Sequence, residues 1–254
     1  MIQRSHFMRG LCAAVALLAV AGTANADQLD DIRAAKKIRV AIDLGSPPFG
    51  TNDASMKPTG SDVETARLLA KDLGVELEIV QTSGANRVPF LQTGKADVVV
   101  SSLSVTPERQ KVIDFSAPYA QIQAVVAAPK ALAVKSFADL AGKRVATARG
   151  TTNDRLATEG AKGAQIVRFD DDSTLVTAIA SGQVEIFATS PAIVKTVAQK
   201  APALGIETKF VMQTFPLGIG MRKGETKLQS WINDWVAKNT ENGKLADIYK
   251  RFHG

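Results

Sequence analysis

The chain has 254 residues, of which 45% are hydrophobic, and a formal net charge of +6. Its basic residues are dispersed rather than clustered, so the charge does not predict nucleic-acid binding. The chain holds one cysteine and two histidines, and Cys12 and His6 both lie near the start, which leaves too few ligands for a zinc site or a histidine-based triad. We therefore expect no metal and no cofactor.

Residues 1–26 have the pattern of a cleaved export signal. Arg4 and Arg9 form a basic start, residues 10–22 are apolar and rich in alanine, and Ala24-Asn-Ala26 fits a cleavage site. The apolar run is too short to span a bilayer stably, and no later segment is long and apolar enough. We expect a mature protein that begins near Asp27 and is exported to the periplasm.

The first half of the mature chain alternates short strands with helices, which favours an α/β fold with a parallel sheet. Strands are predicted at 38–42, 75–80 and 98–100. A helix that Ser61 or Asp62 can cap is predicted up to Leu73, and a second helix at 85–91. The loop after the first strand presents Asp43, Ser46 and Phe49, and helix 85–91 carries Arg87 in its first turn. Such sheets bind ligands at the carboxyl ends of their strands, so these residues are candidates for a site.

The most informative stretch runs from Val98 to Arg109. Its apolar β-branched start predicts a buried strand, Ser101, Ser102 and Ser104 follow, and Thr106-Pro107 predicts a helix start with Arg109 in the first turn. Hydroxyls, free N–H groups and a guanidinium suit a carboxylate. The alternative is a capped helix whose Arg109 pairs with a surface acid.

The second half repeats the same scheme. The strand-like residues 122–128 lead into it, and strands are predicted at 143–148, 165–169 and 184–188, with helices at 136–140, after Gly150-Thr-Thr-Asn153, at 171–181 and from Pro191. Residues 210–221 return as extended chain to the first half of the fold, and two amphipathic helices follow. Trp231 and Trp235 lie on the apolar stripe of the first of these helices, which predicts core packing.

The stretch Ser102-Leu-Ser-Val-Thr-Pro-Glu-Arg109, followed by Asp114-Phe-Ser-Ala-Pro-Tyr119, resembles the periplasmic polar amino acid-binding proteins of ABC importers. The resemblance covers essentially the whole mature chain. It implies an α/β fold of the two-lobed periplasmic-binding-protein type (type II), each lobe a mainly parallel sheet flanked by helices, joined by a two-strand hinge. We expect lobe 1 at 27–123 and 216–254 and lobe 2 at 124–215.

The resemblance also implies roles for individual residues. Ser102 and Ser104 match positions that contact the ligand carboxylate, Arg109 matches the arginine that clamps it, and Thr152 and Asn153 lie in a matching Gly-Thr-Thr segment of the second lobe. The ligand-binding residues expected in this way are Asp43, Phe49, Arg87, Ser102, Ser104, Arg109, Thr152, Asn153 and Ser190.

Three positions bear on which ligand is bound. Arg87 resembles an arginine that faces an acidic ligand, which favours an acidic amino acid. Ser46 stands where an aromatic platform is more common, so a simple aromatic-sandwiched ligand is in doubt. Ser190 stands where an aspartate usually holds the ligand's α-ammonium, and a serine supplies no countercharge. Carboxylate recognition is therefore better supported by the sequence than ammonium recognition.

The function implied by the resemblance is capture of a polar, acidic amino acid between the lobes by a monomer, without catalysis. Delivery to an inner-membrane permease follows. One alternative is a binder of an amine-free carboxylate or dicarboxylate. Another is an enzyme like the cyclohexadienyl dehydratases, which resemble the same family and need a carboxylic acid in the cleft, for which Glu185 or Asp43 are the candidates.

Overall fold

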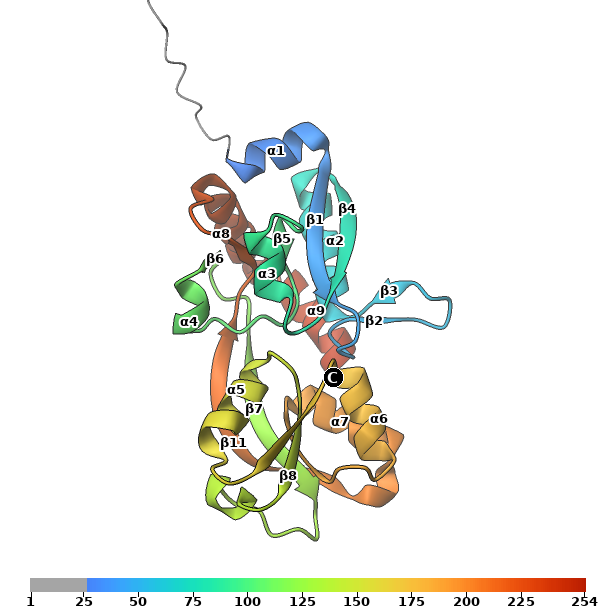
Figure 1. Cartoon of the computed structure of the whole chain (residues 1–254). Coiled ribbons are helices and arrows are strands. Elements are labelled where there is room, and N and C mark those ends of the chain that lie inside the picture. The colour runs from blue at the N-terminus through green and yellow to red at the C-terminus, as the bar shows by residue number, and fades with distance from the viewer. Residues whose placement is uncertain (1–26) are drawn as a thin grey trace, which may run out of the picture.

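The apolar strands build two separate five-stranded sheets, one in each of two lobes (Figure 1). The computed structural model describes residues 27–254, so the predicted export signal, with Cys12 and His6, lies outside the described residues. Lobe 1 holds the first sheet, in the order β4-β1-β5-β12-β6, and lobe 2 holds the second, in the order β11-β7-β10-β8-β9. This arrangement confirms the predicted two-lobed α/β fold.

The strands of the two sheets have the following bounds. The first sheet contains β1 Lys37–Asp43, β4 Glu76–Thr82, β5 Val98–Val99, β6 Ile113–Phe115 and β12 Gly220–Arg222. The second contains β7 Ala120–Pro129, β8 Arg144–Ala148, β9 Gln165–Phe169, β10 Ile186–Thr189 and β11 Ile206–Leu217. In each sheet four strands share one direction and one strand, β12 or β7, runs against them. The sheets are therefore mainly parallel, as expected.

Helices cover both sheets, and a small hairpin of β2 Thr51–Asn52 and β3 Pro58–Thr59 projects from lobe 1 (Figure 1). Lobe 1 contains α1 Gln28–Ala35, α2 Ser61–Leu73, α3 Arg87–Gln92, α4 Pro107–Gln110, α8 Thr226–Glu241 and α9 Lys244–His253. Lobe 2 contains α5 Thr152–Gly160, α6 Asp172–Ala180 and α7 Pro191–Lys200, with short 3₁₀ turns at Phe137–Leu140 and Pro202–Leu204. None of the helices within residues 27–254 has the length and apolar character needed to cross a membrane.

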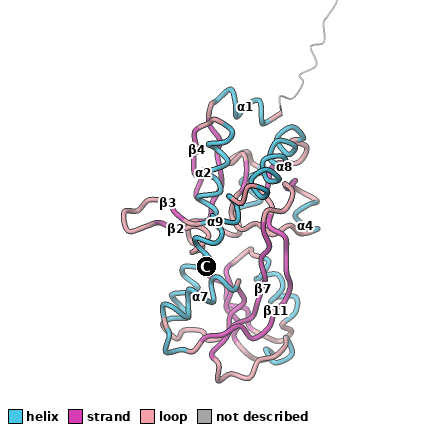
Figure 2. Tube along the Cα trace, turned by 180° about the vertical axis from the view of Figure 1, so that it is seen from behind, coloured by secondary structure: helices cyan, strands magenta, loops and turns pink. Residues whose placement is uncertain are grey.

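Two long strands connect the lobes. β7 and β11 pair antiparallel from Ala120 opposite Leu217 to Pro129 opposite Ile206, and Figure 2 shows them side by side between the upper and lower parts of the molecule. The predicted lobe boundaries fall inside these strands, so the exact residues at which one lobe ends stay a prediction. Because both strands belong to the second sheet, the hinge lies near their lobe 1 ends.

Each lobe has its own apolar core. In lobe 1, the β1 residues Ile38, Val40 and Ile42 pack with residues of α2 and α8, and they are fully buried. Trp235 belongs to this core, and its indole Nε1 donates to Asp72 Oδ2 at 2.9 Å. Trp231 is half-buried and packs against the same core. The prediction that both tryptophans serve core packing is confirmed.

Two sequence predictions about local structure were wrong. Helix α2 begins at Ser61, but Gly60 and not Ser61 or Asp62 occupies the N-cap. Gly60 has φ +123°, and a Cβ there would lie 2.2 Å from the Phe49 carbonyl oxygen, so the tight turn requires glycine. The segment 136–140 forms a 3₁₀ turn rather than a full helix.

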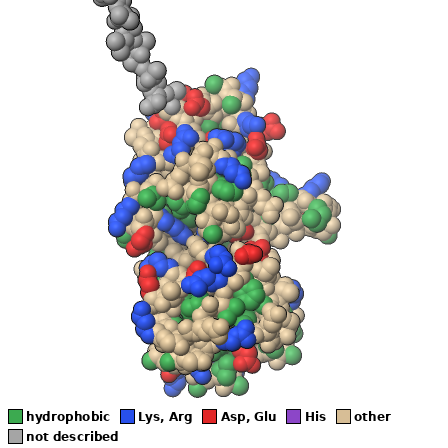
Figure 3. Space-filling view, viewed as in Figure 1, with side chains coloured by type: hydrophobic (Ala, Val, Ile, Leu, Met, Phe, Trp, Pro, Cys, Tyr) green, Lys and Arg blue, Asp and Glu red, His purple; other side chains and the backbone are tan. Residues whose placement is uncertain are grey.

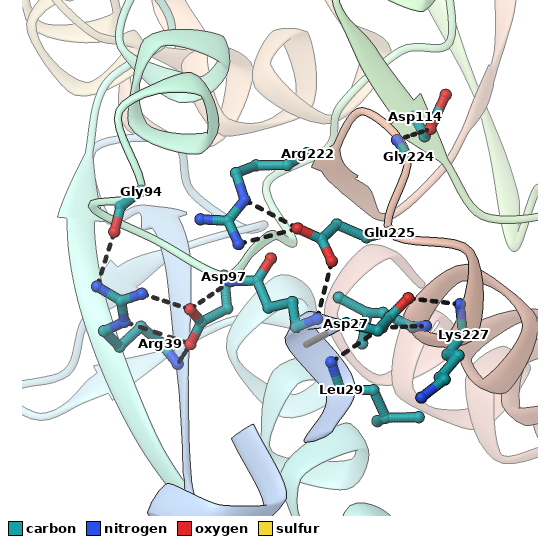
Figure 4. A network of polar contacts seen from close by, with 12 residues as sticks. Asp27, Leu29, Arg39, Gly94, Asp97, Asp114, Arg222, Gly224, Glu225 and Lys227 are labelled. Carbon is teal, nitrogen blue, oxygen red and sulfur yellow. Dashed lines mark hydrogen bonds and ion pairs between the residues drawn. The ribbon is translucent and has the colours of Figure 1, made fainter. Parts of the chain in front are cut away.

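A polar network ties the start of the described chain to lobe 1 (Figure 4). The Asp97 carboxylate accepts from Gln28 Nε2 at 2.6 Å, from the Arg39 backbone N at 2.7 Å and from Arg39 Nη2 at 2.5 Å. Glu225 accepts from the Gln28 backbone N at 2.8 Å and from the guanidinium of Arg222. One buried carboxylate therefore holds α1 and β1 together.

We predict that Asp97→Ala lowers the free energy of unfolding by about 2–3 kcal/mol, because it leaves the buried partners of the carboxylate unpaired. Asp30→Ala is the matched control, since Asp30 pairs with Lys227 at the surface and should cost far less. Urea denaturation of both variants measures the difference. Equal losses in the two variants would contradict the assigned role of Asp97.

Candidate ligand-binding site

A small cavity lies between the two lobes, where the carboxyl ends of β1, β5, β8 and β10 meet. It has a volume of about 30 Å³. The residues that line it are Asp43, Ser46, Phe49, Arg87, Ser102, Ser104, Ile122, Gln123, Ala124, Ala148, Thr151, Thr152, Asn153, Asp172 and Ser190. All but one of the residues expected from the sequence are thus brought together.

Arg109 is the exception. It lines a neighbouring, more open cleft, which shares Thr151 and Thr152 with the cavity. The cavity also includes residues that were not expected as ligand contacts, among them Asp172 and Gln123. The sequence did not point to Asp172 as a ligand contact, because an acidic residue in the first turn of a helix is common and needs no functional role.

Asp43 and Phe49 come from the loop after β1. Asp43 Oδ1 accepts from the Gly45 backbone N at 2.9 Å, and the Asp43 backbone N donates to Ser101 Oγ at 3.1 Å. Burial raises the pKa of the Asp43 carboxyl, although the charge of Arg87 acts against the rise. The loop therefore holds a carboxylate in a position where little water reaches it.

Arg87 is the first residue of α3 and is almost wholly buried. Its Nε donates to the Gly84 carbonyl at 3.1 Å and its Nη1 to the Ser101 carbonyl at 2.8 Å. Burial lowers the pKa of Arg87, and the nearby carboxylates of Asp43, Asp172 and Asp62 act in the opposite direction. The guanidinium is thus fixed by carbonyls and surrounded by negative charge.

Asp62 is a buried acid that the sequence suggested only as a helix cap. Burial raises its pKa to about 7, against the opposing effects of Arg87 and the Ser102 backbone N–H. It lies in the first turn of α2, directly after the glycine turn at Gly60. Asp62 therefore adds a second acidic group from lobe 1 whose pKa depends on the charge of Arg87.

Arg109 is positioned by the short helix α4. Thr106 caps this helix, its hydroxyl accepting from the Arg109 backbone N at 3.3 Å, and Arg109 Nη1 donates to the Ser104 carbonyl at 2.9 Å. Burial and the charges of Arg87 and Arg155 lower the pKa of Arg109 to about 9. Within residues 27–254 no carboxylate forms an ion pair with it, so the alternative of a surface ion pair is not realised.

The lobe 2 residues stand at the starts of three helices. Thr151 caps α5, accepting from the Asp154 backbone N at 3.1 Å, and Thr152 and Asn153 follow in the first turn. Asp172 lies in the first turn of α6, and Ser190 directly precedes α7. Burial raises the pKa of Asp172 to about 6. The positive ends of these helices favour a negative charge, and at α6 the protein's own Asp172 supplies one.

The lobes touch across the cavity. Ser46 Oγ donates to Asp172 Oδ2 at 2.5 Å, Ser104 Oγ lies 3.3 Å from Thr152 Oγ1, and the Ser173 backbone N donates to the Gly45 carbonyl at 2.8 Å. Figure 3 shows basic and acidic side chains gathered where the lobes meet. The cavity volume suits a water molecule or two rather than an amino acid, so a larger ligand needs the lobes to part.

Other candidate positions lie elsewhere. Glu185, proposed as an acid for an enzymatic alternative, is exposed and lines a surface cleft of lobe 2 away from the cavity. A separate cavity of about 420 Å³ lies within lobe 1 between α2 and α9, with largely apolar walls. Among residues 27–254 no cluster of His, Cys, Asp and Glu is arranged to hold a metal ion.

The two lobes, the crossing strands and a cavity at the carboxyl ends of strands are the architecture of a two-lobed binding protein. The family model for bacterial extracellular solute-binding proteins, family 3, matches residues 38–254. The chain therefore belongs to this family.

Named relatives agree with that membership. An L-cystine-binding protein of Escherichia coli strain K12 is 28% identical over 244 residues, which cover 95% of this chain and 92% of the relative. The ABC transporter arginine-binding protein 1 of the same strain is 30% identical over 219 residues, covering 85% and 90%. These relatives are transport binding proteins.

Solved structures agree as well. The ancestral amino acid-binding protein AncCDT-1, described as a precursor of cyclohexadienyl dehydratase, has a TM-score of 0.80 and 33% identity, covering 89% of this chain and all of that one. A solute receptor for L-cysteine from Neisseria gonorrhoeae has a TM-score of 0.82 and 29% identity, covering 88% and 92%.

We predict that Gly84→Ala weakens ligand binding at least tenfold by opposing closure. A Cβ at Gly84 would lie 2.8 Å from the Arg149 carbonyl oxygen, across the lobe interface, so the closed form must shift while the open form need not. Calorimetric titration measures the affinity, and urea denaturation without ligand should show an unchanged fold. Wild-type affinity in the variant would contradict the prediction.

Proposed function

We propose that this protein captures a polar α-amino acid in the cavity between its lobes, in the periplasm, and presents the closed form to the permease of an ABC importer. The observation that carries the proposal is the half-buried guanidinium of Arg109, which has no carboxylate partner within residues 27–254. Its Nη1 donates to the Ser104 carbonyl, and it lines the same cleft as Thr152, whose hydroxyl lies 3.3 Å from the Ser104 hydroxyl. A ligand carboxylate would supply the missing negative charge.

If the ligand carboxylate faces Arg109, the residues that contact the rest of the ligand can be named. Ser104 and Thr152 touch each other across the lobes, and a carboxylate entering between them would take the hydrogen bonds that they now share. Ser102, Asn153 and Phe49 line the same cavity and would contact the remainder of the ligand. The closed form would be favoured by as much as these contacts are better in it than in the open form.

The nature of the ligand side chain depends on Arg87. An acidic amino acid was expected because Arg87 resembles an arginine that faces an acidic ligand. However, Arg87 already faces the carboxylates of Asp43, Asp62 and Asp172. A further negative charge would meet the protein's own acidic groups, which supports a zwitterionic polar amino acid over an acidic one. The relatives named above for cystine and arginine fit this balance.

We predict that Arg109→Ala weakens binding by about 2–5 kcal/mol, because the ligand carboxylate would be buried without its charged partner. Arg109→Lys should recover only part of the loss, since a point charge does not reproduce the guanidinium fork. Arg155→Ala is the matched control, because Arg155 lines the same cleft but pairs with Glu159. The measurement is calorimetric titration after a thermal-shift screen of all amino acids.

Two results would remove this proposal. One is the absence of binding of any amino acid by the wild-type protein. The other is near-normal affinity in Arg109→Ala.

Arg87 can be tested with a pair of ligands of the same shape. We expect Arg87→Gln to weaken glutamate and glutamine by similar factors, because Arg87 balances the protein's own carboxylates. The ratio of the two dissociation constants is the readout, since any general loss of stability cancels in it. A selective loss of glutamate binding of tenfold or more would restore the acidic assignment.

An enzyme of the dehydratase type is a second candidate, favoured by the likeness to AncCDT-1 and by the raised pKa values of Asp43 and Asp172. Such a reaction needs a protonated acid beside the leaving group. Assay of prephenate and arogenate turnover separates the two functions. Turnover that is lost in Asp43→Asn or Asp172→Asn would favour the enzyme, and binding without turnover favours transport.

A further inference from the structure

Two oxygens of the cavity have no hydrogen-bond partner among the described residues. They are Asp172 Oδ1 and Ser190 Oγ, both from lobe 2 and both shielded from solvent. Ser190 is 4% exposed as a residue. Buried polar atoms are normally paired, so two acceptors beside one cavity indicate a donor that the protein itself does not supply.

The surroundings define the charge of that donor. Asp172 Oδ2 accepts from Ser46 Oγ at 2.5 Å, which fixes the carboxylate at the lobe interface with its other oxygen free. Asp43 lies close enough for its charge to act on Asp172. Two neighbouring carboxylates and a serine hydroxyl form a site for a cation with several N–H donors, and a primary ammonium has three.

We propose that Asp172 binds and neutralises the α-ammonium of the ligand, with Ser190 Oγ as a second acceptor. The inference rests on the proposed function, because it assigns the amine end of an amino acid whose carboxylate faces Arg109. It resolves the difficulty that Ser190 has no charge: the countercharge comes from the start of α6 rather than from residue 190. Ser46 positions the carboxylate from the opposite lobe, so this contact also belongs to the closed form.

The cavity and the cleft beside it differ in charge. Arg109 lines the cleft, which shares Thr151 and Thr152 with the cavity, whereas Asp172 and Asp43 line the cavity itself. A zwitterion that spans the two places its carboxylate toward Arg109 and its ammonium toward Asp172, whereas an amine-free acid leaves Asp172 Oδ1 without a donor. Asp172 is therefore the residue that selects amino acids against carboxylates of the same shape.

The test compares an amino acid with its deaminated analogue. The probes are the amino acid with the highest affinity in the screen and the carboxylic acid that lacks its α-amine. Asp172→Asn keeps the shape and the hydrogen bond to Ser46 but removes the charge. We expect it to weaken the amino acid at least tenfold, while the deaminated acid binds as well as before or better. Asp171→Asn is the control, because it removes a neighbouring charge and asparagine also caps a helix well.

The decisive variant is the double substitution Asp172→Asn with Ser190→Asp, which moves the charge across the same cavity. We expect it to recover at least half of the lost affinity, measured on a logarithmic scale. An unchanged affinity of the amino acid in Asp172→Asn, or an equal loss for the two probes, would overturn the inference. Failure of the proposed function looks different, because the wild-type protein would then bind neither probe.

Discussion

The guanidinium of Arg87 is buried where the two lobes meet. The positions of the acidic side chains around the cavity depend on the contacts that stabilise this buried charge. Two carbonyls, from Gly84 and Ser101, fix the guanidinium, and carboxylates from β1, α2 and α6 face it. A buried charge without partners costs several kcal/mol, so the three acids and the arginine stabilise one another. Burial raises the pKa values of these acids, and the charge of Arg87 opposes the rise.

The residues that line the cavity are distinct from the residues that form the two apolar cores. The carboxyl ends of the strands present short polar side chains, while the apolar cores of β1, α2 and α8 in lobe 1 and of the second sheet in lobe 2 lie behind them. Contacts between the lobes include polar ones, such as Ser46 with Asp172 and Ser104 with Thr152. Such contacts exchange readily for contacts with a ligand, so β7 and β11 can act as a hinge without disturbing either core.

Much of this organisation could be predicted from the sequence because it depends on local patterns. The buried run at Val98 to Val100 and the Thr106-Pro107 helix start predicted local elements, and a resemblance to a known family predicted the two lobes. Asp172 could not be found in this way, because its role arises only when the α6 start of lobe 2 meets Ser46 of lobe 1. Asp62 was misread as a cap for a similar reason: its burial depends on the turn at Gly60 and on the distant Phe49 carbonyl.

The central claim is that an amino acid lies between the lobes, with its carboxylate toward Arg109 and its ammonium toward Asp172. The most direct measurement is a crystal structure of the protein with the amino acid that binds most tightly. We expect the ligand carboxylate within hydrogen-bond distance of the Arg109 guanidinium and the ammonium nitrogen within the same distance of Asp172 Oδ1. A ligand bound in the reverse orientation, or seated in the apolar cavity between α2 and α9, would contradict the claim.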